Sequence, residues 1–192
     1  TLNIGIGQGQ VSATPLQLAV MTARIAAEGK IVTPRIIGEG PRPDADIPLD
    51  APFDEEHMQR MKAAMFGVTS EAGGSALRSG DLGLGGPRLA GKTGTSQVRR
   101  ISAQERATGV LEGDQIARRL RDHALFVAYA PHDDPKYAIS VIVEHGEGGS
   151  KAAAPVARDI MAEAMRLDAR RSPAYTRTAN TGGGSGTGSG GL

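Results

Sequence analysis

A lysine, a glycine and two threonines stand together at Lys92-Thr93-Gly94-Thr95, the most informative segment of the chain. The flanking residues, Leu89-Ala90-Gly91 and Ser96-Gln97-Val98, favour an extended strand around them. An ammonium group and two hydroxyls suit the recognition of a carboxylate, which accepts hydrogen bonds and carries negative charge. The glycine leaves room for a substrate backbone to lie alongside. The segment therefore predicts a site for a substrate with a free carboxylate.

The residues that would complete covalent catalysis do not accompany this motif. In one class of serine-nucleophile enzymes, Lys-Thr-Gly works with Ser-x-x-Lys and Ser-Asp-Asn motifs. No serine in this sequence has a lysine three residues later, and no Ser-x-Asn triplet occurs. The nearest imitation, Ser79-Gly80-Asp81, lies too close to Lys92 and has no upstream nucleophile. We therefore expect part of a catalytic domain that lacks the residue for the covalent chemistry.

A bare Lys-Thr-Gly also has a simpler interpretation, a strand with an exposed lysine. The tripeptide has on the order of a one in twenty chance of occurring in a chain of this length at average residue usage. Its setting favours the functional interpretation, because a Gly-rich approach precedes it and two strong strand patterns follow a polar loop.

Three glycines near the beginning of the sequence suggest a nucleotide-binding loop. Gly5, Gly7 and Gly9 alternate with other residues, but the dinucleotide fingerprint needs glycine where Gln10 stands. No strand precedes them either. We favour a turn close to the cleft over phosphate binding.

His123 follows Asp122 at the head of a predicted strand, which could indicate acid–base catalysis or metal binding. The 4 histidines show no ligand spacing such as i, i+4 on a helix, so no metal site is predicted. A structural hydrogen bond from His123 is the favoured interpretation.

Arginines gather in a polar segment between residues 99 and 122. They are Arg99, Arg100, Arg118, Arg119 and Arg121. Acidic residues interrupt this run, so a solvated loop face is the favoured interpretation, and contact with a partner protein or a glycan strand is the alternative. A short amphipathic helix is expected around residues 115–120.

Two helices are predicted in the first part of the chain. Thr14-Pro15-Leu16-Gln17 carries a capping box with proline at the first helical position, and Gly29 ends this helix. Its residues are apolar on nearly every face, so we expect it to be buried. Asp54 caps the second helix. The apolar stripe of that helix is expected to face the core and consists of Met58, Met61, Met65 and Val68.

The rest of the chain predicts strands closed by a final helix. A short strand could run from Val32 to Ile37, and further strands are expected at Lys92, at 125–130 and at 137–144. The last two should pair as an antiparallel hairpin. A helix is predicted to begin near Ala152, with Pro155 in its first turn. This order indicates an α+β fold with an antiparallel sheet flanked by helices.

Composition fits a single domain. The chain has 192 residues, 39% of them hydrophobic, a net charge of +1 and no cysteine, so neither nucleic-acid binding nor a disulfide framework is indicated. We expect one domain over residues 1–171 and a disordered Gly/Ser/Thr-rich tail over 172–192. Because the sequence opens on Thr1 in a Gly-rich loop, with no anchor or export signal, we expect a truncated chain whose anchor lies elsewhere.

Four ordered segments together resemble the class B penicillin-binding proteins. They are Gly5-Ile6-Gly7-Gln8-Gly9, Thr14-Pro15-Leu16-Gln17-Leu18-Ala19, Leu89-Ala90-Gly91-Lys92-Thr93-Gly94-Thr95 and Asp122-His123-Ala124-Leu125-Phe126-Val127-Ala128-Tyr129-Ala130-Pro131. The basic loop that ends at residues 119–124 resembles in particular the elongation transpeptidases of the penicillin-binding protein 2 group. The resemblance covers roughly residues 1–168 and implies the C-terminal part of a transpeptidase fold.

The resemblance also implies roles for the motif residues. Lys92 would face the cleft and supply positive charge near the serine motifs, and the hydroxyls of Thr93 and Thr95 would bind the terminal carboxylate of the substrate. Gly94 would keep that face of the strand open for the peptide. The backbone N–H of Thr95 would be one of two oxyanion-hole donors, the other coming from the nucleophile.

The implied function is a peptidoglycan D,D-transpeptidase of cell-wall elongation and cell shape. It would act by serine acyl transfer on D-Ala-D-Ala stem peptides, bind β-lactams and need no cofactor. The complete protein would lie at the periplasmic face of the inner membrane, with membrane-embedded elongation proteins as partners, whereas the isolated chain would be inactive. A β-lactam sensor or noncatalytic penicillin-binding module and a serine β-lactamase are the alternatives.

Overall fold

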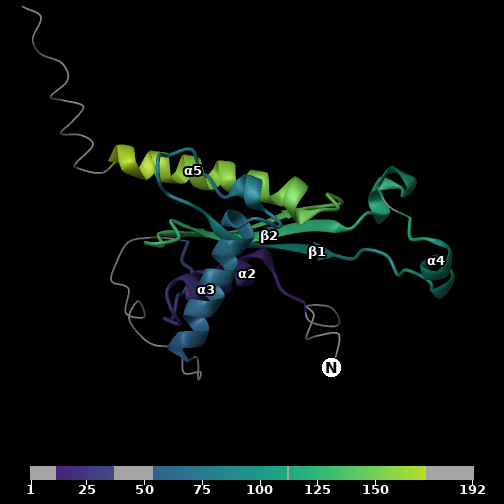
Figure 1. The fold of residues 1–192 in the computed structure, drawn as a ribbon, viewed down its shortest axis with the longest axis horizontal. Coiled ribbons are helices and arrows are strands. Elements are labelled where there is room, and N and C mark those ends of the chain that lie inside the picture. The colour runs from purple at the N-terminus through teal and green to yellow at the C-terminus, as the bar shows by residue number, and fades with distance from the viewer. Residues whose placement is uncertain (1–11, 37–53, 112, 172–192) are drawn as a thin grey trace, which may run out of the picture.

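The computed structural model describes residues 12–36, 54–111 and 113–171. Within them lies a three-stranded antiparallel sheet in the order β1–β2–β3. Its strands are β1 (Ala90–Ser96), β2 (His123–Ala130) and β3 (Tyr137–Val143). Figure 1 shows α5 (Ala154–Arg171) on one face of the sheet, and α2 (Pro15–Ala26) and α3 (Glu55–Ser70) on the other. The predicted α+β class is confirmed, whereas the glycines at 5–9 and the tail at 172–192 lie outside the described residues.

Helix α2 begins where the capping box predicts. Thr14 Oγ1 accepts a hydrogen bond from the Gln17 N–H at 3.2 Å, and Gln17 Oε1 accepts one from the Thr14 N–H at 2.8 Å. The expected burial on nearly every face is wrong, because only Thr22 and Ala26 are buried and Leu16 is 58% exposed. The helix packs one face against β2 and β3, and a single packed face leaves the others open in the described part of the chain.

The prediction of a strand from Val32 to Ile37 is also wrong for the residues of this segment that the structure describes. Residues 31–36 form no strand, and Ile36 is fully exposed. A strand needs partners for its backbone groups, and Pro34 has no N–H to offer. Local β propensity could not supply the missing partner.

Helix α3 has the predicted cap and most of the predicted core stripe. Asp54 Oδ1 accepts a hydrogen bond from the Glu56 N–H at 3.0 Å. Met58 and Met65 are buried, whereas Met61 is 43% exposed at the margin of the stripe. The helix contacts the sheet through Met65, which packs with Ala90 and Tyr129, and Val68 packs against the core beneath α5.

The two faces of the sheet carry separate cores. Phe126, Ala128 and Ala124 of β2 pack with Ala157 and Met161 of α5. On the other face, a second cluster surrounds Tyr129 and consists of Ala26, Met65, Ala90 and Tyr129. β2 alternates between the two cores because successive side chains of a strand point to opposite faces.

The predicted hairpin and final helix are confirmed. β2 and β3 pair antiparallel, with Ala130 opposite Tyr137 across the turn. A π-helical turn, η4 (Gly149–Ala153), leads directly into α5, so Pro155 falls in the first turn of the α-helix as expected. None of the helices within the described ranges is both long and apolar enough to cross a membrane.

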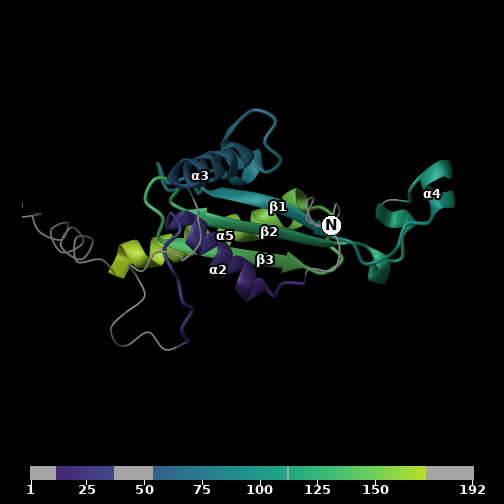
Figure 2. The same cartoon turned by 90° about the horizontal axis from the view of Figure 1, so that it is seen from below.

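The insertion between β1 and β2 contains one short α-helix, α4 (Ala103–Thr108), and two 3₁₀ turns, η2 (Gly113–Gln115) and η3 (Arg118–Leu120). The helix expected at 115–120 is therefore misplaced. The signal for α4 was present, because Ser102 accepts a hydrogen bond from the Glu105 N–H and the pair has capping-box spacing. Figure 2 shows α4 standing away from the sheet.

Candidate active site

All four predicted site residues lie in β1. This strand pairs with β2 along one edge, with Lys92 opposite Val127, Thr93 opposite Phe126 and Gly94 opposite Leu125. The other edge of β1 has no strand partner among the described residues. An unpaired strand edge offers backbone donors and acceptors to an extended peptide.

The motif residues are divided between the two faces of the sheet. Thr93 and Thr95 lie opposite Phe126 and Ala124, whose side chains belong to the core beneath α5. Lys92 lies on the face of Ala90, which packs with the helices on the other side. The ammonium group and the hydroxyls therefore approach the outer edge of β1 from opposite faces.

The side chain of Lys92 is exposed. Its Nζ donates a hydrogen bond to the backbone oxygen of Thr93 at 2.8 Å. Among the described residues, no carboxylate forms an ion pair with it. A single neutral carbonyl partner leaves two ammonium hydrogens free for a bound anion.

Gly94 and Thr95 complete the strand. A Cβ added at Gly94 would meet only the Cβ of Leu125, at 3.3 Å, so the leucine side chain rather than backbone borders that space. Thr95 is exposed, and its hydroxyl is available to solvent or ligand. The predicted carboxylate, backbone and oxyanion roles of the motif stay predictions.

One residue near the motif was not anticipated. Ser75, in the loop that follows α3, places its Oγ 3.1 Å from Thr93 Oγ1. No local sequence signal singles out Ser75, because the two hydroxyls meet only through the path of a long loop. The site therefore has a third hydroxyl beside the two threonines.

His123 makes the structural contact favoured from the sequence. Its Nδ1 accepts a hydrogen bond from the backbone N–H of His145 at 3.0 Å, and the two rings lie 4.8 Å apart. His145 Nδ1 lies 3.0 Å from the Arg121 backbone oxygen. In the described ranges, no group of three or more histidine or acidic side chains could hold a metal ion.

The arginine run is neutralised in part by its own acidic residues. Arg99 forms a two-pronged ion pair with Glu105, with N–O distances of 2.8 and 2.5 Å. The hydrogen bond from Arg99 is the main cause that lowers the pKa of Glu105 to about 2. Arg118 and Arg119 are exposed on a 3₁₀ turn. The interrupted basic run is therefore largely a solvated loop face, and a partner contact at Arg118 and Arg119 remains a prediction.

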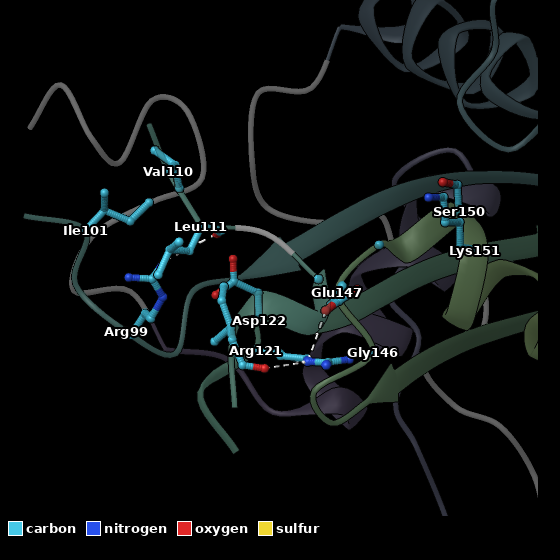
Figure 3. Close-up of a pocket in the computed structure, with 13 residues that line it drawn as sticks. Arg99, Ile101, Val110, Leu111, Arg121, Asp122, Gly146, Glu147, Ser150 and Lys151 are labelled. Atoms are coloured by element: carbon cyan, nitrogen blue, oxygen red, sulfur yellow. Dashed lines mark hydrogen bonds and ion pairs between the residues drawn. The ribbon is translucent and has the colours of Figure 1, made fainter. Parts of the chain in front are cut away.

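A pocket of about 630 Å³ lies between this insertion and the turn that follows β3. Figure 3 shows Arg99 and Leu111 on the insertion side and Gly146 and Glu147 on the turn. Two of its arginines are already engaged, since Arg121 Nε lies 3.3 Å from Glu147 Oε1 and Arg99 pairs with Glu105. None of the four motif residues lines this pocket, so it is separate from the predicted site.

Comparison with protein families and curated proteins gives a consistent result. The penicillin-binding protein transpeptidase domain matches residues 1–162. Peptidoglycan D,D-transpeptidase MrdA of Haemophilus influenzae is 35% identical over 173 residues, which cover 84% of this chain and 25% of that protein. MrdA of Acinetobacter baumannii is 36% identical over 162 residues, which cover 80% of this chain and 22% of that protein. The chain thus spans about a quarter of the length of these relatives.

Solved structures of penicillin-binding proteins are similar to this chain as well. Penicillin-binding protein 2 of Pseudomonas aeruginosa, solved in complex with WCK 5153, has a TM-score of 0.62 and 36% identity, covering 83% of this chain and 31% of that one. The complex between penicillin-binding protein 2 and MreC from Helicobacter pylori gives a TM-score of 0.66 and 34% identity, covering 86% of this chain and 27% of that one.

Proposed function

This chain belongs to the penicillin-binding protein transpeptidase family, and we propose that it contributes the substrate-binding strand of a peptidoglycan D,D-transpeptidase of cell-wall elongation. The complete enzyme would transfer the acyl group of a D-Ala-D-Ala stem peptide to a serine and then to an acceptor amine. The first step forms an ester with the serine oxygen and releases the terminal D-alanine. The second breaks that ester as the amine forms the crosslink.

The observation that carries this proposal is the position of Lys92-Thr93-Gly94-Thr95 at an edge of the sheet without a strand partner among the described residues. An extended peptide can add to this edge through its backbone, as in other strand-addition complexes. Thr93 and Thr95 then present hydroxyls to its terminal carboxylate from one face, and Lys92 presents its ammonium group from the other. The Thr95 N–H serves as an oxyanion donor in this proposal.

The acylated serine must come from outside these residues, because no serine here has a lysine three residues later. We therefore expect the isolated 192-residue chain to be inactive toward β-lactams. The relatives named D,D-transpeptidase favour this function over the sensor and β-lactamase alternatives.

The proposal extends to location and partners. The complete protein would act at the periplasmic face of the inner membrane, where its peptidoglycan substrate lies. Because a penicillin-binding protein 2 has been solved with MreC, elongation-complex proteins of that kind are the proposed partners, through regions beyond this chain.

Labelling with a fluorescent penicillin tests the proposal. The complete protein should be labelled at a stoichiometry near one, and its Lys92→Ala variant should be labelled far more slowly. The isolated chain should not be labelled. Labelling of the isolated chain near one-to-one would refute the need for an outside serine, and an unlabelled complete protein would refute the transpeptidase assignment.

A further inference from the structure

The hydroxyl of Ser75 lies 3.1 Å from that of Thr93, across 18 positions of sequence. We propose that Ser75 is a positioning residue of the carboxylate site: its hydroxyl donates to Thr93 Oγ1 and thereby directs the Thr93 O–H toward the bound carboxylate. This inference rests on the proposed function, in which Thr93 binds the terminal carboxylate of the substrate.

The direction of the hydrogen bond follows from the chemistry of the ligand. Either hydroxyl of the pair can donate while the site is empty. A carboxylate only accepts hydrogen bonds, so Thr93 must turn its single hydrogen toward it. The oxygen of Thr93 is then free to accept the hydrogen of Ser75, and two hydrogen bonds in series strengthen one another.

The backbone on both sides of Ser75 is fixed to the end of α3. The Ala76 N–H donates to the Val68 oxygen at 3.0 Å, and the Gly74 N–H donates to the Glu71 oxygen at 3.0 Å. A Cβ at Gly74 would lie 2.5 Å from the Val68 oxygen, so only glycine allows this close approach. Ser75 is thus held in place by its neighbours rather than by its own contacts.

The strand that carries Thr93 is tied to the same helix end. Thr69, which is fully buried in the last turn of α3, donates its hydroxyl to the backbone oxygen of Leu89, just before β1. The Leu89 N–H in turn donates to the Gly80 oxygen at 2.9 Å. Because both partners are anchored to α3, their separation is set by backbone packing.

The loop also places Ser75 beside the sheet edge. Met65 of α3 packs in the core on one face, whereas Ala76 and Leu82 pack in the core beneath α5. The chain between Met65 and Ala76 therefore passes from one face to the other beside β1, and Ser75 lies on this passage. Its hydroxyl is exposed and reaches Thr93 from the loop side.

The test measures acylation of the complete protein by a penicillin with a free carboxylate and by its methyl ester. Ser75→Ala should lower the second-order rate constant for the acid about tenfold, the size expected for one lost hydrogen bond to a group that contacts a charge. The penicillin concentration that gives the half-maximal rate should rise, whereas the limiting rate at saturating penicillin should not change. The ester should react equally with both proteins.

Two further variants separate positioning from structural damage. Ser75→Thr keeps the hydroxyl and should restore the rate with the acid. In a Thr93→Val background, Ser75→Ala should have no further effect, because the group that it orients is gone. Unchanged melting temperatures would accompany these results.

The outcomes distinguish the two proposals. If penicillin acylates the wild type but Ser75→Ala has the same acylation rate, the positioning role alone is overturned. Equal losses of rate with the acid and the ester would also overturn it. So would a further loss of rate when Ser75→Ala is added to Thr93→Val. An unlabelled wild type would overturn the proposed function, and the positioning role with it.

Discussion

Gly149 lies flat against the backbone of Gly94, the glycine of the motif strand. A Cβ added at Gly149 would sit 2.8 Å from the Gly94 oxygen and 3.1 Å from its nitrogen, and only 2.3 Å from the Leu125 oxygen of the neighbouring strand β2. The first residue of η4 thus supports β1 at the motif. Because backbone atoms line this contact, they cannot turn aside as a flexible side chain would.

We expect Gly149→Ala to lower the free energy of unfolding by about 1–3 kcal/mol, the range for inserting a methyl group into packed surroundings. Gly148→Ala is the matched control, because a Cβ there would meet only the Lys151 side chain, at 3.9 Å. Urea unfolding of the protein that carries this chain measures both variants. Equal midpoints for the two would contradict the predicted contact.

Two substitutions at Thr95 separate its side chain from its backbone. Thr95→Val removes the hydroxyl proposed to bind the substrate carboxylate, so the apparent affinity for carboxylate-bearing penicillin should fall. Thr95→Pro removes the N–H as well, and loss of one oxyanion donor typically lowers the rate about 10²–10³-fold. Acylation rates of the complete protein measure this, with thermal unfolding as the check on folding. Equal limiting rates in the two variants would contradict the oxyanion role.

The ion pair of Arg99 and Glu105 should hold the insertion in its conformation over a wide pH range. The pKa of Glu105 is lowered from 4.5 to about 2. A lowered carboxyl pKa stabilises the fold above the ordinary value and loses that contribution as the pH falls from about 4.5 toward 2. The protection of the α4 amides against hydrogen exchange, measured relative to the intrinsic exchange rate at each pH, should therefore fall over this window.

Glu105→Gln should show the faster exchange already at pH 7, where wild type is protected. Arg106→Gln is the matched control, since Arg106 lies next in the same helix, is exposed, and has no side-chain hydrogen bond or ion pair with another residue of the described ranges. Fast exchange in both variants alike would show that the ion pair does not order the segment.

His132 should also make stability fall as the pH drops, but over a higher pH range than Glu105. Burial, together with the charge of Lys62 and against that of Asp133, lowers the pKa of His132 below 6.5. The ring stacks on Phe66 with centroids 4.0 Å apart, and its Nδ1 lies 3.3 Å from the Tyr129 hydroxyl. The unfolded chain therefore binds a proton more readily, and stability falls as the pH drops from 6.5 toward the folded pKa.

His132→Phe preserves a ring against Phe66 and should flatten this dependence between pH 7.5 and 5. Thermal unfolding at the two pH values measures it. His57→Gln, at an exposed position on α3, should keep the wild-type slope. A wild-type slope in His132→Phe would assign the dependence to another group.

Local interactions made much of the fold predictable. The capping box of Thr14 and Gln17 and the Asp54 cap each join residues that lie within three or four positions of one another, so their helices begin where expected. The β2–β3 hairpin depends on a short turn between alternating strands, and it too is confirmed. The motif strand was found for the same reason, since its residues are consecutive.

The failures have the opposite cause. The segment at 31–36 has strand-forming residues but no partner strand in the described chain, and the apolar residues of α2 outnumber those that one packed face can cover. The helix in the insertion was misplaced although Ser102 and Glu105 marked its start. Partner availability and packing area are properties of the whole arrangement.

The residue order is enough to place a lysine and two threonines in one strand, and the alternation of a strand then separates Lys92 from both hydroxyls. The unpaired edge of this strand among the described strands, and the contact of Ser75 with Thr93, depend on how the chain folds. The difference comes from the range of the interactions involved. Strand periodicity acts between neighbours, whereas the Ser75 contact depends on a loop packed against the end of α3, 18 residues from its partner at Thr93.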